Sequence, residues 1–385
     1  MTLPGGISLR HLDRMTDCTG LVQHAIYSVP RRESGYTIDD NARALRLCIR
    51  LWSYERDERM LNRLIAYLSL LEFSKRPGGG FHNLMNYQRQ WLDTDSSGDC
   101  QGQAMRALAD VVSSGLPDDL RHLALELMQR ALPTLAELRS LRAQAYVVIA
   151  FGRLRSMDHE VVPRVEAIAR SAARHLMECF ERSRRPSWVW FESRMTYANA
   201  VLPHALFVAE RCWPDQGFGS VAAASFSFLE AQTTSAGLFE PVGSNGWYSH
   251  GETKARYDQQ PVEAVTMADA ALAGYELLGE EVYLTSLRRA HAWFRGGNSE
   301  GLIVGIEREG ACYDGLMAGG VNRNQGAEST LAFLWTSIIL AEGAMAKRQR
   351  CFVQPGHGAP DHPEGDDTGP PALSLAIAPE EPTRG

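Results

Sequence analysis

The stretch SGYTIDDNARALRLCIRLW, residues 34–52, places two adjacent carboxylates at the start of an apolar run of helical length. Thr37 suits the N-cap position, and Asp40, three residues later, is placed to return a hydrogen bond in a variant of the capping box. Acidic side chains in a first turn also meet the positive end of the helix dipole. On this segment alone, helix capping is the favoured interpretation of the two acids over a catalytic role.

The same arrangement recurs along the chain, which changes that balance. A polar or glycine-containing opening precedes an apolar, alanine-rich run five more times, near residues 95, 142, 192, 258 and 324. The markers of the six openings lie 59, 45, 53, 61 and 70 residues apart, and they are Asp40, Asp99, Gln144, Tyr197, Asp258 and Glu328. Each interval has room for two helices and their loops.

Segments with a single apolar face lie between these runs, at residues 9–27, 57–75, 117–138, 159–183, 219–233 and 280–297. In residues 57–75, for example, positions 60, 61, 64, 65, 68 and 71 form one apolar stripe at helical spacing. Helices that are apolar nearly all round, alternating with one-faced helices, are typical of a closed two-layer ring. The sequence therefore predicts an all-α (α/α)6 toroid of six inner and six outer helices, with a small hairpin near residues 301–308.

The composition is that of an ordinary globular protein, with 44% hydrophobic and 22% charged residues among 385. A net charge of -7 indicates no basic face, which argues against nucleic acid or an anionic membrane as partner. The first fifteen residues lack the apolar core of a secretory signal, and no apolar run is long enough to cross a bilayer, so we expect a cytoplasmic protein. Seven cysteines without a CxxC pair are expected to be reduced thiols.

The end of the chain differs in composition from the rest. Residues 350–385 are rich in proline, glycine and acid, and contain few aromatic residues. Such a segment cannot bury enough apolar surface to offset its ordering entropy. We therefore expect one toroid domain at residues 1–349 and a disordered tail at residues 350–385.

In an (α/α)6 toroid the inner helices run parallel, so their polar openings share one mouth. The acids expected to gather there are Asp39, Asp40, Asp99, Glu192, Asp258, Glu263 and Glu328. A like-charge cluster of this kind raises some pKa values and separates them. We expect the catalytic pair to come from Asp40, Asp99, Asp258 and Glu328, which open four different inner helices, with Glu192 and Glu263 in reserve.

Three loops expected at the same mouth, residues 78–93, 187–192 and 240–252, combine aromatic rings with hydrogen-bonding groups. A sugar ring offers C–H faces for stacking and hydroxyls for polar contacts. Trp190 and Phe191 fit core packing equally well, whereas Trp247 and Tyr248 follow a glycine and are expected in an exposed loop. The candidate substrate-binding residues are Asp39, His82, Asn83, Arg89, Trp190, Glu192, Tyr197, Trp247, Tyr248, His250, Gln259, Glu263, Asn324 and Gln325.

Five segments together resemble bacterial carbohydrate-active proteins of the six-hairpin glycosidase superfamily. They are GYTIDDNARAL (35–45), GDCQGQAMRAL (98–108), WVWFESRMTYANAVLPHAL (188–206), GWYSHGETKARYDQQPVEA (246–264) and VNRNQGAEST (321–330). The resemblance spans residues 9–342 and implies the toroid and a saccharide ligand, with mannose-containing compounds suggested. Such proteins often carry a glycosyltransferase-like label, but a helical toroid lacks the nucleotide-binding domains usual in those enzymes. The resemblance assigns no residue a catalytic role.

Three functions remain open on the sequence. Glycoside hydrolysis needs two carboxyl groups, and residues on different inner helices favour the wider separation of an inverting enzyme. A sugar epimerase or isomerase needs positioned histidines, whereas His82, His204 and His250 are scattered. A non-catalytic saccharide-binding protein would tolerate Gln144 and Tyr197 among the openings. Hydrolysis is the main prediction, without cofactor or metal; Ca²⁺ held by Asp39, Asp40 and Asp99 is a lesser alternative.

Overall fold

The computed structural model describes residues 8–353, and twelve α-helices lie within this range. Its compact unit extends to Ala346. The predicted domain boundary at residue 350 falls inside the last helix, which continues to Val353. Beyond that residue, the predicted tail lies outside the described part of the chain.

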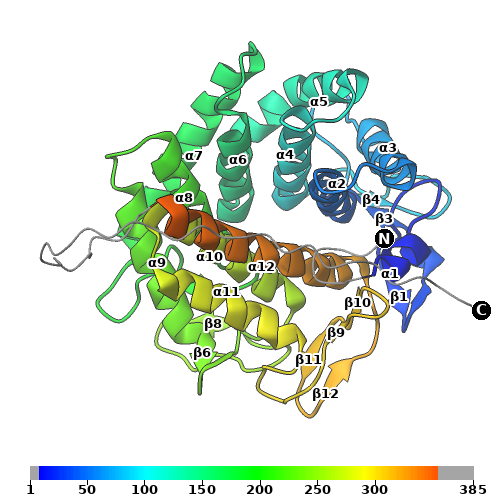
Figure 1. The fold of residues 1–385 in the computed structure, drawn as a ribbon. Helices are drawn as coiled ribbons and strands as arrows, with labels where there is room; N and C mark the ends of the chain where they lie inside the picture. The colour runs from blue at the N-terminus through cyan, green and yellow to red at the C-terminus, as the bar shows by residue number, and fades with distance from the viewer. Residues whose placement is uncertain (1–7, 354–385) are drawn as a thin grey trace, which may run out of the picture. The chain divides into compact units, whose positions relative to one another are not determined.

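Six helices form the inner layer of a ring and six the outer layer, as the sequence predicts (Figure 1). The inner helices are α2 (Ile38–Trp52), α4 (Gly98–Val112), α6 (Leu141–Leu154), α8 (Val201–Cys212), α10 (Pro261–Leu278) and α12 (Ala327–Val353). The outer helices are α1 (Arg10–Met15), α3 (Glu58–Phe73), α5 (Asp118–Ala136), α7 (Val161–Ser183), α9 (Phe218–Thr233) and α11 (Glu281–Phe294).

Burial separates the two layers in the expected way. Every residue of α4 from Cys100 to Val112 is buried, because an inner helix meets neighbours on all sides. On α3 burial is confined mainly to one face, which includes Met60, Leu64 and Leu68. Ile65, which the apolar stripe included, is instead 43% exposed.

Polar contacts show that the inner helices run parallel and close into a ring. At their carboxyl ends Arg50 of α2 donates to Glu342 of α12 at 2.5 Å. Asp110 of α4 accepts at 2.9 Å from both Arg46 of α2 and Arg153 of α6. The amino ends of the same helices meet at the opposite side of the ring, as described below.

The first outer helix is much shorter than predicted. Helix α1 ends at Met15, and the rest of residues 9–27 forms bends and the start of a hairpin, β1 (Ala25–Ile26) and β2 (Val29–Pro30). Asp17 stops the helix from continuing, because its carboxylate accepts the backbone N–H groups of Thr19 and Gly20 in a tight turn.

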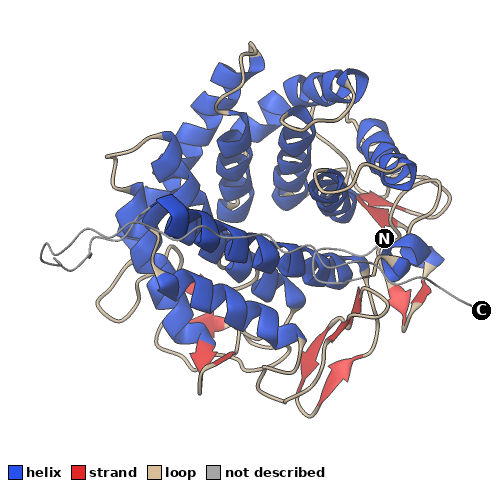
Figure 2. Cartoon of the chain, in the orientation of Figure 1, coloured by secondary structure: helices blue, strands red, loops and turns tan. Residues whose placement is uncertain are grey.

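The remaining strands are two or three residues long and pair antiparallel (Figure 2). The pairs are β3 (Tyr36–Thr37) with β4 (Leu84–Met85), β5 (Arg194–Met195) with β8 (Tyr248–Ser249), β6 (Thr234–Ser235) with β7 (Leu238–Phe239), β9 (Gly305–Ile306) with β10 (Ala311–Cys312), and β11 (Gly315–Met317) with β12 (Gly320–Asn322). The predicted hairpin near residues 301–308 corresponds to β9 and β10.

Within the described residues one helix, at residues 327–350, is long and apolar enough by length and composition to cross a membrane, contrary to the expectation of none. Of its most apolar window, 61% is buried in the protein, since it belongs to inner helix α12. The six cysteines whose side chains are described are all free thiols.

Candidate functional site

The amino end of α2 is capped from another part of the chain, which answers the question that its two acids raise. Thr37 occupies the N-cap position, but its side chain makes no capping hydrogen bond. Asn83 Oδ1 instead accepts the backbone N–H groups of Ile38 at 3.1 Å and Asp39 at 3.2 Å. Asn83 is therefore a capping residue rather than a sugar ligand, and the acids of α2 are available for other contacts.

Three carboxylates surround the single guanidinium group of Arg43, one turn into α2. Its Nη1 lies 2.9 Å from Asp40 and 3.3 Å from Asp39, and its Nη2 lies 3.2 Å from Glu328 at the start of α12. Thr37 adds a hydrogen bond of 2.7 Å from its hydroxyl to Asp40. We call Asp39, Asp40, Arg43 and Glu328 the Arg43 cluster.

The Arg43 cluster holds more negative than positive charge when all its carboxyl groups are ionised. Burial, followed by the neighbouring Asp39, raises the pKa of Asp40 to about 7, although Arg43 opposes the shift. Burial also raises the pKa of Glu328, again against the effect of Arg43. Asp40 is 5% exposed, whereas the Glu328 side chain is 41% exposed. The cluster can therefore hold a proton near neutral pH, and Glu328 presents the more accessible oxygens.

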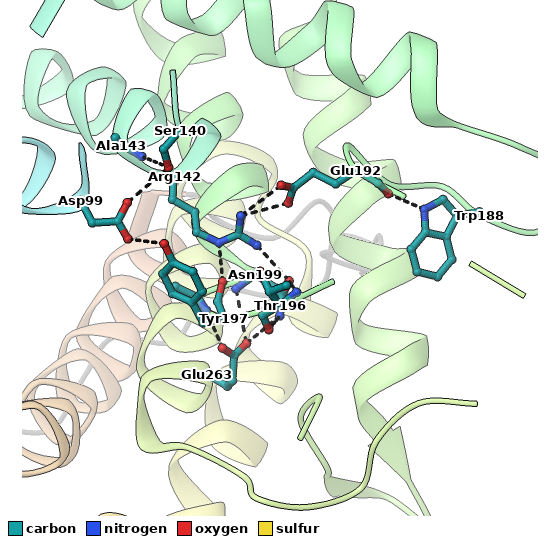
Figure 3. Close-up of polar contacts among 11 residues, drawn as sticks. Asp99, Ser140, Arg142, Ala143, Trp188, Glu192, Thr196, Tyr197, Asn199 and Glu263 are labelled. Carbon is teal, nitrogen blue, oxygen red and sulfur yellow. Dashed lines mark hydrogen bonds and ion pairs between the residues drawn. The ribbon is translucent and has the colours of Figure 1, made fainter. Parts of the chain in front are cut away.

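A second group of polar residues lies at the amino ends of α4, α6 and α8 (Figure 3). The Tyr197 hydroxyl donates to Asp99 at 2.6 Å, and Ser140 donates to the other Asp99 oxygen at 3.3 Å. The Arg142 guanidinium lies 4.8 Å from the centre of the Tyr197 ring and pairs with Glu192 at 3.0 Å. Asp99 is thus a half-buried carboxylate that two hydroxyl groups orient.

Tyr146 of α6 lies within electrostatic range of both groups. Burial and then Asp99 raise its pKa to about 12, whereas Arg43 and Arg142 lower it. The Cys100 thiol of α4 also lies within electrostatic range of the Arg43 cluster. Burial and then the negative charge of Asp39 raise its pKa. The Arg43 cluster and Asp99 therefore face the same end of the ring.

Glu263 has a structural role. Its carboxylate, 5% exposed, accepts the backbone N–H groups of Ala198 at 2.5 Å and Asn199 at 3.3 Å, and the Asn199 amide at 3.0 Å. These contacts hold the turn that leads into α8. Burial raises the Glu263 pKa to about 7 despite these donors. Because its three donors all belong to this turn, we interpret Glu263 as a support for the Tyr197 segment.

Asp258 differs from the other three catalytic candidates. It lies in the loop before α10, and its side chain is exposed. No hydrogen bond or ion pair joins its carboxylate to another residue in the described range 8–350. The structure therefore places Asp258 outside both polar groups.

Two residues predicted to bind the sugar are buried in the protein and contact other residues instead. Trp190 is fully buried and packs edge-on against Phe191, so it is a core residue. Gln259 is also fully buried, and its amide bonds to Trp293, Arg256 and Ser299. These two predictions were wrong, because a loop sequence does not distinguish a core plug from an exposed ligand.

The other loop candidates keep partly exposed surfaces. His82 stacks on Trp91 with ring centres 5.1 Å apart, and His250 contacts Ser187 at 3.2 Å. Trp247 is half-buried at a left-handed φ of 62°, and the neighbouring Tyr248 donates to Gln232 at 3.2 Å. Of the remaining candidates, Arg89 contacts Cys18, and Asn324 accepts from the Tyr27 backbone N–H. Gln325 is buried, and its backbone bonds to Tyr27 and His11.

Sequence reasoning missed the two arginines that organise the mouth. Arg43 follows Asp39 and Asp40 by four and three residues, the spacing of neighbours on one helix face, and this signal was present in the sequence. Arg142, in the first turn of α6, has no such signal, because its partner Glu192 lies 50 residues later in the chain. Over the described residues no group of three or more His, Cys, Asp or Glu side chains is arranged to hold a metal ion.

Comparison with known proteins identifies the fold. The chain matches no described sequence family and no curated protein. Solved structures similar to it include cellobiose 2-epimerase from Bacillus thermoamylovorans, with TM-score 0.68 and 14% identity over 88% of this chain and 96% of that one. A D-mannose isomerase gives TM-score 0.65 at 12% identity, covering 86% of this chain and 93% of the isomerase.

A third similar structure is the GH76A α-1,6-mannanase of Salegentibacter sp., with TM-score 0.59 and 11% identity over 87% of this chain and 96% of the mannanase. That structure is an inactive variant, with two consecutive aspartates replaced by alanine, in complex with α-1,6-mannotetrose. These likenesses show that the chain has the (α/α)6 toroid fold that the sequence predicts.

Proposed function

We propose that the chain is a carbohydrate-active enzyme that hydrolyses a glycosidic bond in an oligosaccharide, with α-mannosides as the first substrates to test. The observation that carries this proposal is the pairing of two differently held carboxyl groups at one mouth. The Arg43 cluster holds a proton near neutral pH, whereas Asp99 is oriented by Tyr197 and Ser140. Hydrolysis needs one proton donor and one base or nucleophile.

Glu328 is the proposed proton donor. Its side chain is 41% exposed and burial raises its pKa, which is the direction that a proton donor to a leaving-group oxygen needs. Asp40 pairs with the same Arg43 guanidinium group but is only 5% exposed. When Glu328 gives up its proton, Arg43 is close enough, at 3.2 Å, to stabilise the carboxylate that forms.

Asp99 is the proposed base that activates water. Two hydroxyl groups fix its orientation, and it lies on α4 whereas Glu328 lies on α12. Carboxyl groups on different inner helices are more easily placed about 6.5 to 9.5 Å apart, with room for water, than about 5 to 5.5 Å apart. We therefore propose inversion at the anomeric carbon.

The inactive mannanase variant supports a role for the adjacent acids of α2. In that protein two consecutive aspartates were replaced, and Asp39 and Asp40 are likewise consecutive in this chain. Asp39 is half-buried and contacts Arg43 at 3.3 Å. We propose that Asp39 orients a sugar hydroxyl and, by its negative charge, keeps the proton within the cluster.

A sugar epimerase or isomerase is the second candidate, because a cellobiose 2-epimerase and a D-mannose isomerase are among the similar structures. It would need a histidine at the reacting carbon. His204 is 9% exposed inside the ring, while His82 and His250 engage Trp91 and Ser187. His24 does lie within electrostatic range of Glu328, but it is one of the weaker influences on that carboxyl group.

A panel of oligosaccharides incubated with the purified chain separates the candidates. Release of reducing ends supports the hydrolase, and NMR of the first product gives the anomeric configuration. Epimer or aldose–ketose interconversion without new reducing ends would replace the hydrolase by the second candidate. Thermal stabilisation by a saccharide without turnover would identify a binding protein instead.

A further inference from the structure

A cavity of about 500 Å³ lies at the opposite end of the ring, where the inner helices end. Its wall includes seven arginines and four carboxylates, an excess of three positive charges, although the chain as a whole carries -7. The net charge of the sequence indicated no basic face, and this expectation was wrong at this end of the ring. The volume is in the range of small-molecule sites.

Part of this positive charge has an ordinary structural explanation. Arg50, Arg153 and Arg211 lie in the last turns of α2, α6 and α8, where the negative end of a helix dipole favours cations. Each of them also pairs with a carboxylate, the pair between Arg211 and Glu276 measuring 2.6 Å. These arginines alone would not indicate a ligand.

Arg106 is not explained in this way, because it lies in the middle of α4 and is 5% exposed. Its nearest carboxylate oxygen, on Asp269, is 3.5 Å away, and the other Asp269 oxygen accepts from Trp335. In the described residues its buried Nε has no hydrogen-bond partner. Burial, and then the positive charge of Arg46, lower the Arg106 pKa to about 10, so its charge is poorly compensated.

His204 adds an unpartnered polar group to the same wall. It is 9% exposed, lines the cavity, and its ring makes no hydrogen bond with any residue from 8 to 350. Burial lowers its pKa to about 4, so the neutral ring offers one N–H donor.

Two exposed arginines complete the wall nearer to solvent. Arg56 follows α2 and Arg155 follows α6, and both line the cavity. Within the described part of the chain neither guanidinium group makes an ion pair or a hydrogen bond. The cavity therefore has cationic groups both at its opening and, through Arg106, at its buried end.

We propose that this cavity binds a small anion through a phosphate group. Guanidinium groups match phosphate oxygens in pairs of parallel hydrogen bonds, and several arginines around one cavity are typical of phosphate recognition. Arg106 and the His204 ring contact the phosphate from the buried side, and Arg56 and Arg155 close over it. This binding does not depend on the proposed function of the acidic mouth. The phosphate comes either from inorganic phosphate or from a phosphorylated sugar.

Calorimetric titration of the full-length chain at fixed ionic strength tests this inference. The probes are inorganic phosphate, a hexose 6-phosphate and the unphosphorylated hexose. Replacing both Arg56 and Arg155 by glutamine breaks no ion pair of the described protein, so the double variant should fold. It should weaken phosphate binding by about tenfold or more, since the phosphate loses two guanidinium contacts. Arg10→Gln, an exposed arginine outside the cavity, is the matched control and should bind as the wild type does.

Hexose 6-phosphate binding at least tenfold tighter than inorganic phosphate would identify a phosphorylated sugar as the ligand. Equal affinity for both would identify inorganic phosphate, and either result supports the proposal. Absence of saturable binding by both phosphate probes overturns it. Equal binding by the double variant and the Arg10 control also overturns it, and so does equal binding by the unphosphorylated hexose.

Discussion

The two ends of the inner ring have opposite charge, although the same six helices build both. At the amino ends, the acids predicted from the sequence are accompanied by Arg43 and Arg142. At the carboxyl ends, seven arginines line one cavity together with four carboxylates. Parallel helix dipoles favour this distribution at both ends, so charge sign alone does not identify a site.

The informative residues are those that the dipoles do not explain. A helix amino end stabilises a carboxylate and so lowers its pKa, yet the pKa values of Asp40 and Glu328 are raised. Burial and neighbouring acids outweigh the dipole there. Likewise Arg106 lies too far from its helix end to be a dipole partner. Comparison of the two ends therefore directs attention to Glu328 at one and Arg106 at the other.

The largest effect is expected at the acidic end. Glu328→Gln and Asp99→Asn preserve shape but remove proton transfer, so turnover of an active oligosaccharide should fall about 100-fold or more. Circular dichroism should show unchanged folding. Asp258→Asn is the matched control, because its carboxylate is exposed and contacts neither polar group, and it should retain turnover within a few-fold. If only the Asp258→Asn variant loses turnover, Asp258 is the catalytic residue and the assignment of Glu328 and Asp99 is wrong.

The next effect concerns stability. Arg43→Met leaves Asp39, Asp40 and Glu328 without their shared positive charge, and breaking a buried ion pair is costly. We expect the free energy of unfolding to fall by about 2 kcal/mol at pH 8 and by less at pH 5, where protonation relieves the repulsion. Urea denaturation at both values measures this. Arg14→Gln, which loses an exposed pair with Glu309, should cost under about 1 kcal/mol. An equal loss of unfolding free energy at pH 5 and pH 8 would contradict the proposal that the Arg43 cluster holds a proton near neutral pH.

A third effect follows from the raised pKa of Asp40, about 7. The folded state binds this proton more tightly than the unfolded state, so Asp40 makes the unfolding free energy decrease as pH rises from about 4 to about 7. Asp40→Asn should flatten the profile over this window without changing it below pH 3. If thermal melts from pH 3 to 8 give the same profile for both proteins, Asp40 does not retain the proton.

Much of the fold could be predicted from the sequence because inner helices are apolar on all sides and recur at regular intervals. The convergence of Asp99 and Glu328 on one mouth followed from that ring. The residues that hold the helix starts could not be predicted, because Asn83 lies far in the chain from the helix that it caps, and Glu263 lies far from the turn that it holds before α8. The basic cavity was missed for another reason. Net charge averages over the whole surface, so it hides arginines that different helices bring together.

The most direct test of the account is a crystal structure of Glu328→Gln with a bound oligosaccharide that the wild type cleaves. The account predicts a glycosidic oxygen within hydrogen-bonding distance, about 2.6 to 3.2 Å, of the introduced amide. It also predicts a water molecule between Asp99 and the anomeric carbon on the opposite face of the sugar. A saccharide bound in the arginine-lined cavity instead, or at the mouth with Asp99 remote from the anomeric carbon, would contradict it.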